Sequence, residues 1–171
     1  MSLASRYGQE APAPRDSDVK ETIRYTFDEI QRRAYHSTQG LDDTDINCAP
    51  GKGAWSIGQI LDHQLFLVRF MIKTLAPDAI GDIAPYKPGP AGSHNLAEIA
   101  GEREALNERF RAVWQSTPET ALMERRPGLP PSTWADWPIL MRLLRPLTDI
   151  ATHVGQVNYV RRQLGKPVGG S

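Results

Sequence analysis

Four stretches of the chain repeat apolar residues at spacings of three and four, and this pattern limits the possible folds most strongly. Val19, Ile23, Phe27 and Ile30 show it in the first stretch, residues 18–37. Such spacing puts the apolar side chains on one face of a helix. The remaining stretches are 57–75, 95–115 and 139–164. No segment alternates apolar and polar residues as a strand would, so we predict an all-α four-helix bundle.

The ends of these helices carry residues that start or stop helices. Ser56 and Gln59 form an S-x-x-Q pair before the second stretch, and Asn95 and Glu98 stand at the same spacing before the third. A side chain at the first position accepts a hydrogen bond from the backbone three residues later, which satisfies an orphan N–H group. Gly165 follows the last stretch, as is typical of a helix end.

Two long proline-rich connections separate the helices, at residues 76–94 and 117–138. Each is long enough to cross the bundle, so we expect long crossover loops rather than simple up-down-up-down order. Trp134 and Trp137 are expected to form a lid over one end of the core. Pro146 lies inside the last stretch and predicts either a kink or the true start of that helix.

The chain has 171 residues, which favours one domain. We expect a flexible N-terminal arm at 1–15 and a single bundle domain at 16–171. With 20 basic and 20 acidic residues, the charge gives no general attraction to nucleic acid. No apolar run approaches the ~20 residues of a membrane span. Cys48 is the only cysteine, so no intrachain disulfide can form, which fits a cytoplasmic protein.

Three titratable residues fall within or beside the apolar faces. His63 lies in the most apolar helix, and Asp149 and His153 stand four residues apart on the last helix. Residues at that spacing share a helix face and can converge on one ion. Metal sites in bundle cores are built from ligands on facing helices. We therefore predict a divalent metal held by His63, Asp149 and His153. Gln156 is either a hydrogen-bonding partner of this site or a surface amide.

Each of these residues also has a structural interpretation. A histidine in a core is often bonded to one carbonyl, and an Asp–His pair four residues apart can be a hydrogen-bonded surface pair. Two histidines and one carboxylate also match the ligands of non-haem iron oxygenases, although those sites are arranged differently. His36 and His94 lie at a helix end and in a loop, where we expect them in solvent.

Two segments resemble the DinB-like (damage-inducible) bundle family and its thiol-dependent relatives. They are W-S-I-G-Q-I-L-D-H at 55–63 and T-H-V-G-Q-V at 152–157, the latter followed by Arg162 and Leu164-Gly165. The resemblance implies three metal-binding histidines, which fall on His63, position 149 and His153. Here Asp149 replaces the middle histidine, a change that still leaves a competent ligand. The resemblance also implies a bundle with crossed connections and a homodimer.

The resemblance implies a metal-dependent enzyme of the thiol S-transferase or hydrolase type. Its cofactor would be a divalent transition metal, Zn or Ni before Mn or Fe, activating a water or a thiol. The expected partner is a small-molecule substrate such as a low-molecular-weight thiol, with no nucleic acid or membrane. Arg69 and Arg142 are candidates to attract a thiolate, and the residues indicate no separate catalytic base. The alternative is a non-catalytic bundle that binds a ligand or partner, with a structural metal or none.

Overall fold

The computed structural model describes residues 18–126, 134 and 136–168 of the chain. Four long helices form the bundle: α2 (Val19–His36), α4 (Ile57–Leu75), α5 (Leu96–Ser116) and α6 (Ile139–Gln163). Shorter helical turns are α3 (Asp43–Asn47), η1 (Pro77–Ala79) and η2 (Glu119–Met123). The predicted all-α fold is therefore confirmed. The expected arm at 1–15 lies outside the described residues.

The helix starts follow the capping residues in the sequence. The Ser56 hydroxyl accepts a hydrogen bond from the Gln59 backbone N–H at 3.2 Å, and the Gln59 side chain accepts one from the Ser56 N–H at 2.9 Å. Asn95 accepts from the Glu98 N–H at 3.0 Å, which starts α5. These bonds satisfy backbone donors that have no partner inside the helix. Local sequence thus sets where α4 and α5 begin.

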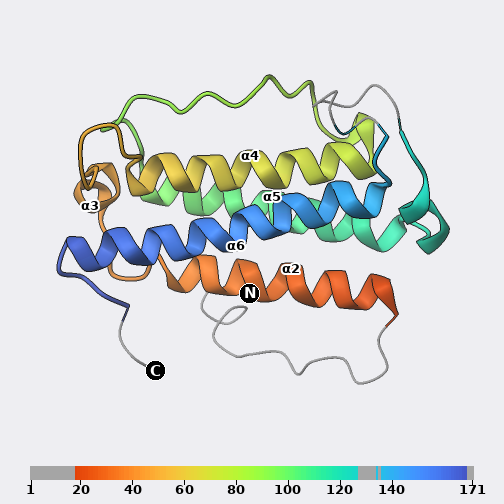
Figure 1. The fold of residues 1–171 in the computed structure, drawn as a ribbon, viewed down its shortest axis with the longest axis horizontal. Helices are drawn as coiled ribbons and strands as arrows, with labels where there is room; N and C mark the ends of the chain where they lie inside the picture. The colour runs from red at the N-terminus through yellow and green to blue at the C-terminus, as the bar shows by residue number, and fades with distance from the viewer. Residues whose placement is uncertain (1–17, 127–133, 135, 169–171) are drawn as a thin grey trace.

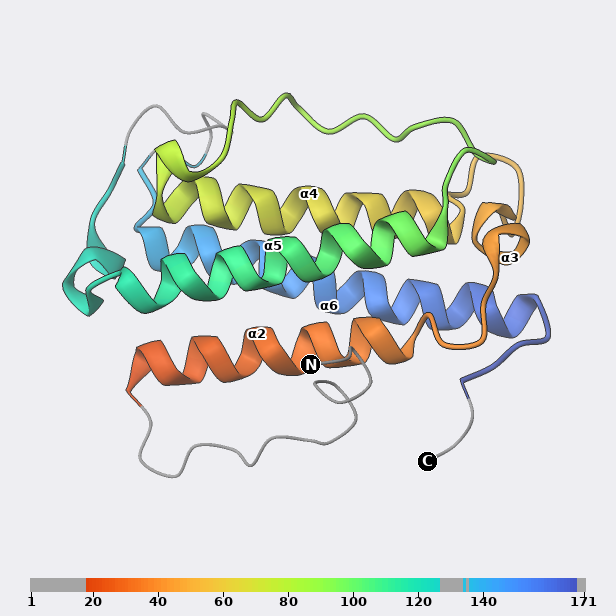
Figure 2. The same cartoon turned by 180° about the vertical axis from the view of Figure 1, so that it is seen from behind.

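Helix α4 lies at the centre of the bundle and packs against both α5 and α6. Its apolar face is wide, and Leu61, Met71 and Ile72 are fully buried in the core. Figures 1 and 2 show that α4 and α5 run in the same direction, whereas α2 and α6 run the opposite way. Helix α4, which contacts both α5 and α6, is therefore the central helix of the core.

The connection between α4 and α5, residues 76–95, travels back along the outside of the bundle (Figures 1 and 2). We call this segment the strap. It is the crossover expected from the first long proline-rich stretch. The second long proline-rich stretch, residues 117–138, connects α5 to α6. Helix α5 ends and α6 begins at the same end of the bundle, so this connection does not have to cross the bundle.

Two sequence features concern the first part of α6, the tryptophan pair before it and Pro146 inside it. Trp134 stacks on Trp137 with ring centroids 5.3 Å apart and meets Phe70 of α4 edge-on at 5.6 Å. Helix α6 begins at Ile139 and continues through Pro146, which is buried. The proline is therefore inside the helix and does not mark its start. Among the described residues, none of the helices is both long and apolar enough to span a membrane.

Candidate functional site

His63 and His153 face one another across the contact between α4 and α6. Their ring centroids are 4.9 Å apart and the rings are nearly perpendicular, at 86°. Both residues are partly buried. The sequence placed these histidines on different helices more than eighty positions apart, and the packing of α4 on α6 brings them into contact. Two of the three predicted ligands therefore meet.

Asp149 lies one helical turn before His153 but is engaged elsewhere. Its Oδ1 atom lies 3.4 Å from Nη2 of Arg145, which is four residues earlier on the same helix. Within the described part of the chain, no three His, Cys, Asp or Glu side chains are grouped so as to hold a metal ion. The rings of His63 and His153 are therefore in contact, whereas Asp149 is paired with Arg145.

Gln156 is the hydrogen-bonding partner of His153. Its Oε1 atom lies 2.7 Å from Nδ1 of His153. An amide oxygen can only accept, so the His153 ring donates from Nδ1, and in that tautomer of the neutral ring the lone pair lies on Nε2. Partners of this kind commonly fix the tautomer and orientation of metal-binding histidines. The contact is the one that the spacing of His153 and Gln156 suggested.

His63 is held in its neutral form. Burial lowers the pKa of His63, and the nearby His153 lowers it further, while the charges of Asp149 and Asp62 act in the opposite direction. The ring therefore keeps a lone pair at neutral pH. Its Nδ1 atom is buried and has no hydrogen-bond partner among the described residues. A buried nitrogen left without a partner is costly, and it is a feature of this site that needs an explanation.

Three aromatic side chains surround the two histidines. Tyr86 of the strap lies 4.4 Å from the ring of His63, between ring centroids, and Phe66 lies 5.8 Å from it. Trp55, just before α4, is 5.5 Å from His63 and 6.3 Å from His153. These rings give the histidine pair an apolar wall, which strengthens electrostatic interactions by excluding water.

Tyr86 is the site residue that sequence reasoning missed. Its hydroxyl donates to the backbone oxygen of Gln59 at 3.0 Å. Burial raises the pKa of Tyr86, and the neighbouring Asp62 raises it further, so the phenol stays protonated. The strap has no periodic pattern that would reveal which of its side chains turns inward. A lone tyrosine in a proline-rich connection was the only available signal.

The strap is fixed to the first turn of α4 at further points. The Gln59 side chain donates from Nε2 to the Gly89 oxygen at 2.7 Å. The ring of His94 lies against Gly58, where an added Cβ atom would be only 2.6 Å from Cγ of His94. His94 is partly buried and its Nδ1 atom is buried, so the ring is less solvated than expected. The absence of a side chain at Gly58 lets the ring pack there.

The two arginines considered for thiolate recognition have other contacts. Arg69 pairs with Glu102 of α5. Arg142 is fully buried and donates from Nε to the Trp134 oxygen at 3.0 Å. Cys48 is exposed beside the end of α3. These contacts give Arg69 and Arg142 a structural role that the sequence did not indicate.

Comparison with known proteins identifies the family. A crystal structure described as the conserved protein of locus from Enterococcus faecalis has the same fold, with a TM-score of 0.72 over 88% of this chain and 100% of that chain. The two sequences are only 16% identical, so the likeness concerns the fold. A search of curated proteins found no match. The family model of the DinB superfamily matches residues 26–157, most of the bundle, and the chain therefore belongs to the DinB superfamily.

Proposed function

We propose that the protein is a metal-dependent enzyme of the thiol S-transferase or hydrolase type, with His63 and His153 as the core of its metal site. The proposal rests on one observation above all: two imidazoles from facing helices meet with ring centroids 4.9 Å apart, and His63 Nδ1 is buried without a partner among the described residues. Imidazole lone pairs are the commonest nitrogen ligands for divalent transition metals.

The residues fit such an ion chemically. His153 is oriented by Gln156, which leaves its Nε2 atom as the ligand atom. Asp149 would become the third ligand after breaking its ion pair with Arg145, whose side chain is 54% exposed. An exposed ion pair of this type contributes only about 0–1 kcal/mol, so exchanging it for a metal bond is inexpensive. Two imidazoles and one carboxylate suit Zn, Ni, Mn or Fe.

The surrounding residues would select and position a small substrate. A divalent ion with three protein ligands supplies an open position and lowers the pKa of a bound water or thiol. Trp55, Phe66 and Tyr86 would exclude bulk water and contact the apolar part of the substrate. Gln156 would hold the His153 ring in place. A low-molecular-weight thiol would suit this site, and we include a cytoplasmic location and a homodimer in the proposal.

The test is metal content, measured by mass spectrometry on untagged protein and on two variants. Wild type is expected to bind close to one equivalent of a divalent metal after incubation with Zn, Ni or Mn. His63→Ala should lose it. His36→Ala removes a histidine of α2, a helix that carries neither member of the pair, and should retain the metal. Wild type that binds none of these metals would contradict the proposal.

A non-catalytic bundle is the second candidate, and a specific observation favours it. Asp149 bonds Arg145, and no three-ligand group is formed within the residues that the structure describes. Substitution with Co(II) separates the two candidates, because its visible spectrum reports coordination. Spectral changes on adding a small thiol would indicate an open position and favour the enzyme. An unchanged tetrahedral spectrum would favour a closed structural site.

A further inference from the structure

The strap, residues 76–95, covers the histidine pair without entering the core. Every residue of the strap is exposed or partly buried, and residues 81–90 belong to no helix, turn or strand. Segments with few buried side chains and no regular backbone hydrogen bonding open at a low cost in free energy. The middle of the strap can therefore move while the four long helices stay packed.

Tyr86 is the strap residue that lies against His63. The centroid of its ring is 4.4 Å from that of His63, 5.4 Å from Phe66 and 5.8 Å from Trp55. His153 occupies a further side of His63, with ring centroids 4.9 Å apart. The neighbours of His63 thus come from α4, α6, the residue before α4 and the strap, and the strap has no residue in the core. Moving Tyr86 is therefore the least costly way to widen access to His63.

A hollow of about 400 Å³ lies between the strap and α4. Residues 80–87 line it from the strap, and Asp62, Phe66 and Arg69 line it from α4. Phe66 and Tyr86 belong both to this hollow and to the aromatic wall of the histidine pair. The strap thus leaves space between itself and α4, and this space ends at the side chains that separate it from the pair.

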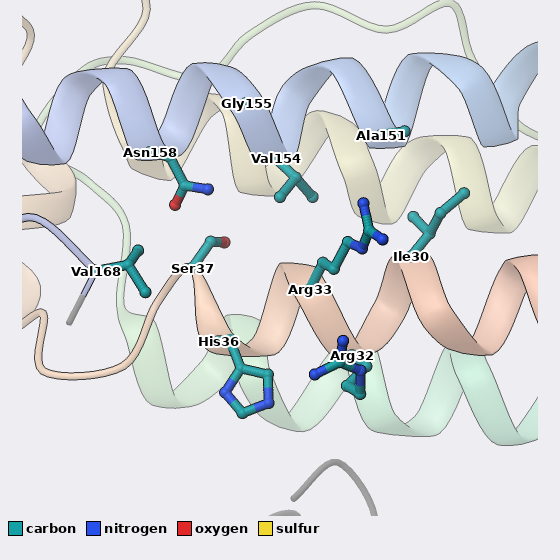
Figure 3. Close-up of a pocket in the computed structure, with 10 residues that line it drawn as sticks. All are labelled: Ile30, Arg32, Arg33, His36, Ser37, Ala151, Val154, Gly155, Asn158 and Val168. Carbon is teal, nitrogen blue, oxygen red and sulfur yellow. The ribbon is translucent and has the colours of Figure 1, made fainter. Parts of the chain in front are cut away.

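A second groove, between α2 and α6, lies away from the strap (Figure 3). Its volume is about 490 Å³, and Ile30 of α2 and Val154 of α6 are among its walls. Neither histidine of the pair and none of the three aromatic residues around it is among the described residues that line this groove. Val154 directly follows His153 on α6, so the two side chains leave the helix about 100° apart. The hollow beneath the strap is therefore the one that borders the pair.

Gln59, in the first turn of α4, holds the middle of the strap through two hydrogen bonds. Its side-chain Nε2 atom donates to the Gly89 oxygen at 2.7 Å, and its backbone oxygen accepts from the Tyr86 hydroxyl, which also faces Asp62, at 3.0 Å. The Gln59 Oε1 atom accepts from the Ser56 backbone N–H at 2.9 Å and so helps to cap α4. The oxygen and the nitrogen of this side chain therefore have different roles, which a substitution can separate.

We propose that the strap is a lid over the histidine pair, that the bonds of Gln59 to Gly89 and Tyr86 hold it shut, and that small molecules reach His63 from the hollow when these bonds break. The lid opens locally, with the four long helices still packed. Each bond is a single neutral hydrogen bond, which shifts an opening equilibrium about two- to tenfold. The inference concerns access to His63 and does not require that a metal bind there.

The first arm of the test measures how fast His63 reacts with diethyl pyrocarbonate, by peptide mass spectrometry on the chelator-treated full chain. The reagent transfers an ethoxycarbonyl group to a neutral imidazole nitrogen and releases ethanol and carbon dioxide. A closed lid should make His63 in wild type react at least tenfold more slowly than N-acetylhistidine at the same pH. Equal rates would overturn the proposal.

The second arm uses variants that release the strap and keep α4 capped. Gln59→Glu retains an acceptor for the Ser56 N–H, as in an S-x-x-E capping box, but has no donor for the Gly89 oxygen. Tyr86→Phe keeps the ring and removes the hydroxyl. Each should speed the labelling of His63 about fivefold, and the double variant about 25-fold, because both bonds break in one opening step. The added charge of Gln59→Glu favours the protonated, unreactive imidazole, so faster labelling cannot result from that charge.

Two controls distinguish local opening from a general loss of structure. Gln115→Glu makes the same substitution at an exposed position of α5 and should label as wild type. His36 of α2, followed in the same samples, should react at an unchanged rate in every variant. Unchanged labelling of His63 in both single variants would refute the lid, and so would a rise at His36 equal to that at His63. Either result would leave the metal-content test of the proposed function unaffected.

Discussion

The ion pairs of Glu29 make a contribution to the stability of the fold that depends on pH. Glu29 is partly buried between Arg32 and Arg33, and its pKa is lowered from 4.5 to about 2. A carboxylate whose pKa is lower in the folded state stabilises the protein above its unfolded pKa. That contribution is lost as the pH falls from about 4.5 towards 2. Glu29 should therefore matter at neutral pH and not in strong acid.

We expect Glu29→Gln to lower the free energy of unfolding by about 1 kcal/mol at pH 7, because each partly exposed ion pair is worth little. The difference between wild type and variant should be constant above pH 5, should shrink as the pH falls towards 2, and should vanish below it. Urea denaturation at a series of pH values measures it. Glu119→Gln, at an exposed position in η2, is the control and should show no such trend. A pH-independent difference would mean that charge is not the cause.

Gly58 permits a contact that any side chain would obstruct. An added Cβ atom would lie 2.6, 2.7 and 2.9 Å from three atoms of the His94 ring. Alanine is nevertheless favoured over glycine in a helix by about 1 kcal/mol. The net effect therefore depends on whether the His94 ring is present.

Gly58→Ala should destabilise the protein by about 1–3 kcal/mol, the usual cost of overpacking. In a His94→Ala background the same substitution should instead stabilise by up to about 1 kcal/mol. Chemical denaturation of the four proteins in this double-mutant cycle gives the sign directly. If Gly58→Ala destabilises the protein equally with and without the His94 ring, the contact with His94 is not the reason that glycine is needed at position 58.

At the scale of the helices, Pro146 is the clearest departure from ideal sequence. It lies inside α6, is buried, and cannot donate a hydrogen bond to the carbonyl of Arg142. The Thr148 hydroxyl bonds the carbonyls of Leu144 and Arg145, each at 2.8 Å, close to the interrupted turn. Leu143 and Leu147, on either side of the proline, are buried in the core, so packing supports both halves of the helix.

We expect Pro146→Ala to raise the free energy of unfolding by about 1–2 kcal/mol. The gain from restoring the hydrogen bond and removing the ring clash is about 3 kcal/mol, and the smaller buried side chain offsets part of it. Thermal denaturation followed by circular dichroism should show a higher Tm. Leu147→Ala, at the next buried position, should lower the Tm instead. A lower Tm for Pro146→Ala would show that the ring is needed for packing.

The helices were predictable because their signals are local. Apolar spacing fixed the faces of α4 and α6, and Ser56 with Gln59 marked where α4 starts. The short helix α3 was missed between the first two predicted helices, although Asp42 and Asp45 form a capping box at its start. One turn of helix is too short to show periodicity, so only its cap could have revealed it.

For the whole molecule, the pairing of His63 with His153 could be predicted, and the rest of the site could not. Both histidines face inward because they follow the apolar spacing of their helices. Asp149 lies at the edge of that face, where Arg145 competes for it. Tyr86 reaches His63 from a connection whose path depends on Gln59 and His94, and no local pattern encodes such distant contacts.

The strap can also be considered as a polymer that has to span a fixed distance. Helix α4 has 19 residues and is therefore about 28 Å long, which roughly nine extended residues could bridge. The connection from Leu75 to Leu96 provides about twice that contour length. The excess lets the chain turn inward at Tyr86 and return to the start of α5. Doubling the length of a loop costs only about 0.6 kcal/mol of closure entropy, so the extra length of the strap destabilises the fold very little.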